Sequence, residues 1–402
     1  MTSPLIAAKQ SRNVAVLAAC QALLFTNNSI LIALNGLAGY ALAADKSLAT
    51  LPVTGWVVGA ALTTFSASLL MKRIGRRAGF TVGACIGIVG AAICAGALSL
   101  GSFWLFCFGT VVFGAYNAFG QYYRFAAADA ATHDFRPRAI SYVLAGGLVG
   151  GIIGPTTSRF TVDLLPTTYL AAYLSLIGFL LLVLALLRLL EIPRPTATES
   201  TERGRPLGEI VAQPAFVVAV LAAAFGYGIM NLLMTATPLA MGICGHPYGA
   251  AATVISSHVV AMFAPSFVTG DLIRRFGTLN VMLWGVVLNL VCVAIALAGV
   301  EVAHFWWSLV LLGVGWNFMF IAATALLTET YRPAEKAAAQ GVNDLVIFIT
   351  MATSSFSSGM ILERNGWQAL NYAAIPFVAA IGIAVVWLMV KRKRGVAAVQ
   401  PR

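Results

Sequence analysis

The sequence predicts an all-α, polytopic membrane protein with twelve spanning helices in two pseudo-symmetric six-helix bundles. Of its 402 residues, 60% are apolar and only 10% are charged, whereas soluble domains are about 45–50% apolar and about 25% charged. Apolar runs of about 20–25 residues with short connections divide a chain of this length into about twelve spans. A β-barrel is excluded because its strands would alternate apolar and polar residues.

The apolar segments follow one another with short polar connections. They are 14–43, 50–71, 78–99, 103–131, 138–160 and 167–190, then 213–242, 249–272, 279–299, 305–329, 337–362 and 368–390. The first is longer than the apolar core of a signal peptide, about 7–15 residues, so we expect a retained helix. The connection 191–212 is rich in proline, threonine and charge, which predicts a cytoplasmic linker between bundles 1–190 and 213–402.

Lysine and arginine gather at alternate connections, and this indicates the orientation of the helices. With the N-terminus inside, 21 of the 25 cations lie at inward positions and three, Lys46, Arg159 and Arg364, lie in outward loops. The remaining cation, Arg124, lies within a span. The distribution predicts a multi-pass protein of the bacterial inner membrane with both termini cytoplasmic. It also explains the net charge of +11 without nucleic acid.

Matching signals occur in the two halves of the chain. Basic runs at 72–77 and 274–277 follow the second and eighth spans, and Arg-Pro pairs at 136–137 and 332–333 follow the fourth and tenth. Two similar bundles around a central pathway are the plan of a transporter that works by rocking of its halves.

On these residues the chain resembles the major facilitator superfamily over nearly its whole length. The family's loop between helices 2 and 3 reads approximately G-x-x-x-D-R-x-G-R-R. Residues 73–77 (Arg-Ile-Gly-Arg-Arg) match the end of this pattern, while Lys72 stands at the position of the aspartate. Residues 150–155 (Gly-Gly-Ile-Ile-Gly-Pro) are similar to a signature that is more common in exporters. The resemblance implies a secondary transporter whose cavity is lined by helices 1, 4, 7 and 10.

Polar side chains within the spans agree with such a cavity, because an amide in hydrocarbon costs several kcal/mol unless it finds a partner. The residues expected to line the substrate-binding cavity are Asn27, Asn28, Asn117, Gln121, Arg124, Tyr227, Asn231, Thr235 and Asn317. The alternative for each asparagine is that it joins helices through hydrogen bonds. A charge within a span is expensive and functional by default, so Arg124 is the strongest candidate, with a structural ion pair as its alternative role.

Two titratable residues within the spans are candidates for carrying a coupling proton. Asp344 is the most deeply placed carboxylate, and its alternative role is that of a permanent partner for Arg124 or for backbone groups. His258 lies in the middle of the eighth span and titrates near neutral pH. Substrate binding or packing within the helix bundle are the alternatives for this histidine.

Charged residues at the inward ends of the helices are candidates for a conformational latch. Asp129 is expected to form a salt bridge with Arg73 or Arg76 of the loop between helices 2 and 3. Glu329, at the corresponding end of the tenth span, is expected to pair with Arg275.

These features predict a secondary active transporter, not an enzyme, that moves a small organic solute by alternating access. We expect proton coupling with export slightly favoured by the signature at 150–155; the alternative is uptake of a small metabolite or vitamin, by symport or facilitated transport. Metal or metalloid efflux is a further alternative, because Cys244 and His246 share an outer loop. A membrane-embedded enzyme would need paired-aspartate, HExxH or Ser/His motifs that the sequence lacks. The expected partners are a small-molecule substrate, protons and the lipid bilayer, with a monomeric protein and no cofactor, metal or nucleic acid.

Overall fold

The structure is a computed structural model that describes residues 4–45, 48, 51–192 and 204–399. All regular elements among these residues are helices, with no strand. The earlier elements are α1 (Pro4–Leu42), α2 (Leu51–Ile74), α3 (Arg76–Leu100), α4 (Phe103–Gly120), α5 (Tyr123–Asp129), η2 (His133–Phe135), α6 (Arg136–Thr161) and α7 (Leu170–Leu187). The later ones are α9 (Leu207–Val211), α10 (Pro214–Ile243), α11 (Tyr248–Phe263), α12 (Ser266–Phe276), α13 (Thr278–Ala298), α14 (Val302–Thr328), η3 (Pro333–Glu335) and α15 (Lys336–Val399).

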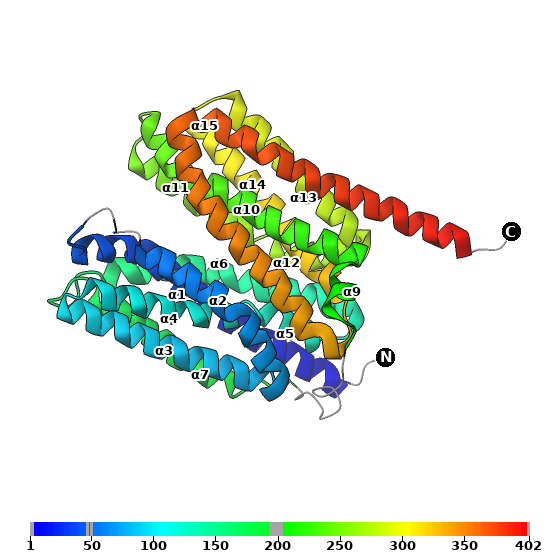
Figure 1. The fold of residues 1–402 in the computed structure, drawn as a ribbon, viewed down its shortest axis with the longest axis horizontal. Coiled ribbons are helices and arrows are strands. Elements are labelled where there is room, and N and C mark those ends of the chain that lie inside the picture. The colour runs from blue at the N-terminus through cyan, green and yellow to red at the C-terminus, as the bar shows by residue number, and fades with distance from the viewer. Residues whose placement is uncertain (1–3, 46–47, 49–50, 193–203, 400–402) are drawn as a thin grey trace. The chain divides into compact units, whose positions relative to one another are not determined.

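The long apolar helices confirm the predicted all-α membrane protein. Within the described residues, ten helices are long and apolar enough to cross a membrane, and the bent pair α11 and α12 makes an eleventh. The 64 residues of α15 would extend about 96 Å at 1.5 Å per residue, about three times the hydrocarbon thickness of a bilayer. The backbone is non-helical at Gly366 (φ 79°, ψ 179°), and Figure 1 shows that α15 changes direction sharply along its length. Its two parts, 336–365 and 367–399, therefore correspond to the predicted eleventh and twelfth spans.

Two compact units divide the chain. The first unit is Met1–Arg203 together with Gln340–Phe348, and the second unit is Gly204–Ala339 together with Ile349–Arg402. The sequence predicts Gln340–Phe348 in the bundle 213–402, whereas the contacts of this segment group it with the first unit. Most of the predicted linker, at 193–203, lies outside the described residues.

In the first unit, α4 packs against both α2 and α3, and α1 packs against α6. Glycines allow the close approach of these helices. A Cβ atom on Gly59 of α2 would lie 1.9 Å from the carbonyl oxygen of Val111 in α4. A Cβ atom on Gly150 of α6 would lie 2.4 Å from the carbonyl oxygen of Ala22 in α1. Gly150 and Gly154 of the 150–155 signature therefore belong to a helix-packing surface.

In the second unit, α14 packs against α10, α11 and α13. This central place matches that of α4 in the first unit, as the sequence repeat predicts. In each unit a short 3-10 turn leads directly into the next long helix: η2 comes after α5, which follows α4, and η3 comes after α14. The two Arg-Pro pairs lie at these equivalent turns.

Candidate functional site

A buried ion pair in the first unit joins the two charged residues that the sequence places deepest in the spans. Arg124 lies in α5, and Asp344 lies in the part of α15 that belongs to this unit. Nη2 of Arg124 donates a hydrogen bond to Oδ1 of Asp344, and Nδ2 of Asn343 donates a second one at 2.8 Å. Each of the two charged side chains is only 2% exposed. At that burial the two charges compensate each other, because water is excluded, and Arg76 also acts electrostatically on Asp344.

The second carboxylate oxygen of Asp344 has a different environment. This Oδ2 atom is buried and has no hydrogen-bond partner among the described residues. A carboxylate oxygen can accept two hydrogen bonds or bind a proton, so Oδ2 has capacity for either. The structure thus provides the predicted contact between Arg124 and Asp344, while the proton-carrying role stays a prediction.

The turn between α4 and α5 positions Arg124. The helix α4 ends at Gly120, and Gln121 and Tyr122 form the turn before α5 begins. The hydroxyl of Tyr122 donates a hydrogen bond to the carbonyl oxygen of Thr64 at 2.8 Å, which fixes the turn against α2. Gln121 is half-buried at this turn.

A group of buried polar side chains from α1 and α4 also lies in the first unit. Nδ2 of Asn28 donates to Oδ1 of Asn117 at 3.0 Å. Both side-chain polar atoms of Asn27 and the hydroxyl of Tyr116 are fully buried. This hydroxyl lies near Asn27 and Tyr123, but neither it nor the amide of Asn27 makes a hydrogen bond of good geometry among the described residues. A buried polar group without a partner costs about 1–3 kcal/mol, so water or a polar solute gains favourable hydrogen bonds here. We name Asn27, Asn28, Asn117 and Tyr116 the amide cluster.

The loop between α2 and α3 supplies a buried arginine. Arg76 is 6% exposed, and its Nε donates to Oδ2 of Asp129 at 3.1 Å. Its Nη2 donates to Oε1 of Gln340 at 2.6 Å. Of the two partners predicted for Asp129, the structure has Arg76, whereas Arg73 is exposed. The contact with Gln340 was not predicted, and the role of these residues as a latch stays a prediction.

In the second unit, Asn317 of α14 holds the break between α11 and α12. Its Nδ2 donates to the carbonyl oxygen of Met262 at 2.7 Å and to Oγ of Ser266 at 2.6 Å. The hydroxyl of Thr269 donates to Oδ1 of Asn317 at 2.7 Å. Pro265 interrupts the helix here because it has no N–H and its ring clashes with the preceding turn. These contacts favour the helix-joining alternative for Asn317 over the predicted cavity role.

Two further residues predicted to line the cavity belong to α10. Asn231 is half-buried, and its Nδ2 donates to the carbonyl oxygen of Met351 and to Oγ of Ser354, both at 3.0 Å. These bonds join α10 to α15 within the second unit. Thr235, one turn further along α10, is exposed.

An aromatic cluster surrounds Tyr227, the third predicted cavity residue of α10. The ring of Tyr227 meets Trp316 edge-on with a centroid distance of 5.4 Å and meets Phe320 at 5.5 Å. Trp316 and Phe320 are stacked at 4.9 Å, and Phe263 lies 5.9 Å from Trp316. Tyr227 is the half-buried member of the cluster, whereas the other three rings are almost fully buried.

His258 of α11 is fully buried in the second unit. Its Nδ1 lies 2.7 Å from the carbonyl oxygen of Leu309 in α14, while Nε2 has no hydrogen-bond partner among the described residues. A neutral ring that donates from Nδ1 leaves Nε2 as an acceptor. The contact with Leu309 fits the packing alternative, and Nε2 keeps the capacity to bind a proton.

One predicted latch pair is wrong. Glu329 pairs with Arg392 near the end of α15, with 3.0 Å between Oε2 and Nη2, instead of with Arg275. The guanidinium of Arg275 lies over the ring of Phe276, 5.2 Å from its centroid. The partner of Glu329 was predicted from the sequence repeat, by analogy with Asp129. That analogy did not consider the basic residues at the end of α15, which include Arg392.

Sequence reasoning missed Glu335, which is 3% exposed. This carboxylate accepts hydrogen bonds from Nε of Arg205 at 2.8 Å, from Nη2 of Arg205 at 2.7 Å and from the backbone N–H of Arg332 at 3.0 Å. It therefore joins the segment before α9 to the turn between α14 and α15. The proline at 333 followed by glutamate at 335 is the signal that could have identified it, because these residues favour the first turn of a helix.

Within the part of the chain that the structure describes, no three His, Cys, Asp or Glu side chains gather in a way that could hold a metal ion. Nε2 of His246, weighed above as a metal ligand, lies 2.7 Å from the carbonyl oxygen of Val300.

The sequence matches the family model described as Major Facilitator Superfamily over residues 17–316 and 248–402. It is 43% identical over 380 residues to the riboflavin transporter RfnT of Brucella anthropi, covering 93% of this chain and 95% of that protein. It is also 31% identical over 351 residues to the uncharacterized MFS-type transporter YdeG of Bacillus subtilis, covering 81% and 80% of the two chains.

Solved structures of transporters share the fold. FucP, a major facilitator superfamily transporter solved in an outward conformation, has a TM-score of 0.79 at 16% identity, covering 93% of this chain and 98% of that chain. The proton:xylose symporter XylE has a TM-score of 0.75 at 13% identity, covering 96% of each chain. At these identities the likeness concerns the fold alone.

Proposed function

The chain belongs to the major facilitator superfamily and is a transporter of that family, and from this premise we propose that it carries riboflavin or a closely related flavin into the cell. The observation that supports this substrate is the 43% identity with a riboflavin transporter over 93% of the chain. Vitamin uptake was the alternative to export in the sequence analysis. The relative supports that alternative better than the preference for export, which rested on the signature at 150–155.

The chemistry of the two units, each taken by itself, suits a flavin. Riboflavin has a planar ring system with apolar faces, an edge of alternating hydrogen-bond donors and acceptors, and a chain of hydroxyl groups. In the first unit, Asn27 offers a donor and an acceptor, and Tyr116 offers a hydroxyl, all buried and without a hydrogen bond of good geometry among the described residues. In the second unit, the aromatic cluster around Tyr227 offers ring faces and edges of the kind that stack on planar ligands.

Proton coupling through Asp344 is part of the proposal. A buried carboxylate is costly while charged, so protonation is favoured when its cationic partner moves away and reversed when the partner returns. Arg124, in contact with Oδ1, is that partner, and the second oxygen is available to bind a proton. Inward movement of one proton down the membrane potential is worth about 2.3 kcal/mol per 100 mV.

The proposed location is the bacterial inner membrane, with both termini in the cytoplasm. The support is the charge distribution, in which 21 of the 25 cations lie at inward positions when the N-terminus is inside.

Uptake of radiolabelled riboflavin by proteoliposomes that contain the purified protein tests this function. We expect riboflavin to accumulate in the vesicles against its own concentration gradient when the lumen is alkaline. Without a pH gradient, we expect exchange of riboflavin. Asn27→Ala should lower riboflavin uptake about tenfold or more, because two hydrogen bonds of about 0.5–1.5 kcal/mol each are lost. Asn280→Ala is the matched control, since its exposed amide donates only to the carbonyl oxygen of Phe276.

Two outcomes would contradict different parts of the proposal. If riboflavin neither exchanges across the vesicles nor raises the melting temperature of the purified protein, the flavin assignment is wrong. If riboflavin exchanges but the pH gradient never drives accumulation, the substrate stands and the proton coupling is wrong.

A further inference from the structure

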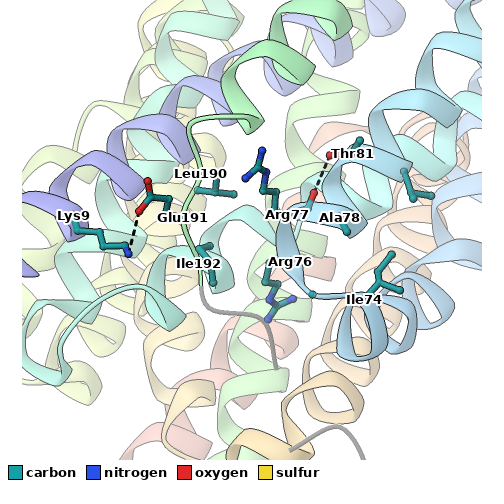
Figure 2. A pocket seen from close by; sticks show the side chains of 11 residues that line it. Lys9, Ile74, Arg76, Arg77, Ala78, Thr81, Leu190, Glu191 and Ile192 are labelled. Carbon is teal, nitrogen blue, oxygen red and sulfur yellow. Dashed lines mark hydrogen bonds and ion pairs between the residues drawn. The ribbon is translucent and has the colours of Figure 1, made fainter. Parts of the chain in front are cut away.

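A cavity of about 760 Å³ lies in the first unit, beside the start of α3 and the end of α7. Its charged lining residues are Lys9, Arg76, Arg77 and Glu191. Figure 2 shows them around the cavity, with Lys9 pointing to Glu191. The lining also includes the aliphatic side chains of Ile74, Ala78, Val82, Leu190 and Ile192, which lie next to the charged residues along the chain. The cavity therefore combines an excess of positive charge with apolar side chains.

The carboxylate of Glu191 does not dominate the charge of this cavity. Its two oxygens pair with Nζ of Lys9 at 3.0 Å and with Nη2 of Arg12 at 2.6 Å. These cations lower the pKa of Glu191, so that it is ionised at neutral pH and fully engaged by its partners. Because two cations pair with one carboxylate, this group has a net positive charge. The arginines of α3 add further positive charge.

The two arginines at the start of α3 have capacity to bind an anion. Nη1 of Arg76 makes only a long contact with Sδ of Met71, at 3.9 Å, although the Nε and Nη2 atoms of this buried side chain are engaged elsewhere. Arg77 is exposed, and the structure records no ion pair for it within the described part of the chain. Guanidinium groups present planar sets of donors that match the oxygens of a phosphate.

Exposed leucines precede the lining residue Leu190 along the chain. Leu182 of α7 is 49% exposed, and Leu189, two residues beyond the end of this helix, is 55% exposed. A free phosphate ion would gain nothing from these aliphatic side chains, whereas an acyl chain buries apolar surface against them.

From this juxtaposition we propose that the cavity binds the phosphate headgroup of an anionic phospholipid, with an acyl chain along the exposed leucines at the end of α7 and just beyond it. The site is distinct from the amide cluster and does not depend on the identity of the transported solute. The positive-inside distribution puts it at the cytoplasmic leaflet, where basic groups meet anionic headgroups.

Lipid titration of the purified full-length protein, followed by native mass spectrometry, tests the proposal. Dioleoylphosphatidylglycerol should occupy its first site more tightly than dioleoylphosphatidylcholine. Arg77→Gln should weaken phosphatidylglycerol binding about fivefold, which is the effect of one cation near an anionic lipid surface. Glu191→Gln should act in the opposite direction, because it releases two cations toward the cavity. Arg188→Gln, an exposed cation outside the lining at the same end of α7, is the matched control and should leave binding unchanged.

Three results would overturn the proposal. One is equal binding of phosphatidylglycerol by the wild type and Arg77→Gln. Another is an equal loss on Arg188→Gln, which would indicate general surface charge instead of a site. The third is thermal stabilisation by inorganic phosphate alone that Arg77→Gln abolishes, combined with no preference for phosphatidylglycerol over phosphatidylcholine, which would make the cavity a free-anion site.

Discussion

Replacing Asp344 by asparagine removes one charge from the buried ion pair with Arg124. Because each side chain is only 2% exposed, the remaining guanidinium would lose this carboxylate in a low-dielectric site. Breaking a buried pair in this way costs about 3–5 kcal/mol. Asparagine keeps an oxygen that can accept a hydrogen bond from Arg124. We therefore expect Asp344→Asn to lower the free energy of unfolding by about 3 kcal/mol, the lower end of this range.

Thermal unfolding of the purified variants measures this effect. For a unit of about 200 residues, each kcal/mol shifts the melting temperature by about 2–4 °C, so the expected fall is about 6–12 °C. The double variant Arg124→Gln/Asp344→Asn should recover a large part of the loss, because neither charge remains. Asp163→Asn, an exposed aspartate of the same unit, is the matched control and should leave the melting temperature unchanged.

Transport by the same variant separates stability from coupling. Asp344→Asn should still exchange solute between loaded vesicles but should not accumulate it in response to a pH gradient. Accumulation equal to that of the wild type would show that Asp344 does not carry the coupling proton, and His258 would be the next candidate. A single variant as stable as the wild type, together with a double variant that is no better than either single one, would refute the buried pair itself.

Three further predictions concern packing and charge. Asn317→Ala should lower stability by about 1–3 kcal/mol, because acceptors at the helix break lose their donor; an unchanged melting temperature would contradict this role. Gly59→Ala should destabilise the first unit, because its Cβ would lie 1.9 Å from the carbonyl oxygen of Val111, whereas Gly178→Ala, with open space around it, should not; equal melting temperatures would refute the close helix contact. The pKa of Glu191 is lowered, so its pairing stabilises the fold above the ordinary value of 4.5 and is lost as the pH falls through the lowered pKa. The melting temperatures of Glu191→Gln and the wild type should therefore differ at pH 7 and converge in acid, and a difference independent of pH would argue against the ion pair.

The fold class and the pairing of the charges buried deepest in the spans could be predicted, because both follow from the order of residues along the chain. Apolar runs determine the spans, and a charge within a span demands a partner wherever the helices pack. The contact between Asp129 and Arg76 follows from the same reasoning, since both residues lie at neighbouring helix ends. These predictions needed no knowledge of how each helix is rotated.

The rest of the candidate site depends on helix rotation and on contacts distant in sequence. Asn317 has the same sequence signature whether it lines a cavity or caps a broken helix, and only the position of α12 decides between them. Tyr116 counts as an apolar residue in a hydropathy pattern, so its buried hydroxyl gave no signal. Glu329 and Gln340 have partners in segments that the repeat does not relate to them.

The grouping of Gln340–Phe348 with the first unit has a consequence for biosynthesis. Arg124 leaves the ribosome 220 residues before Asp344. At about 5–20 residues per second, this separation corresponds to about 11–44 s of translation. During that interval a cation must be tolerated in a nascent segment whose counter-charge from Asp344 does not yet exist. The first unit therefore cannot mature as an autonomous cotranslational domain: its assembly is completed only when the eleventh span is inserted, so the order of synthesis becomes part of the folding pathway.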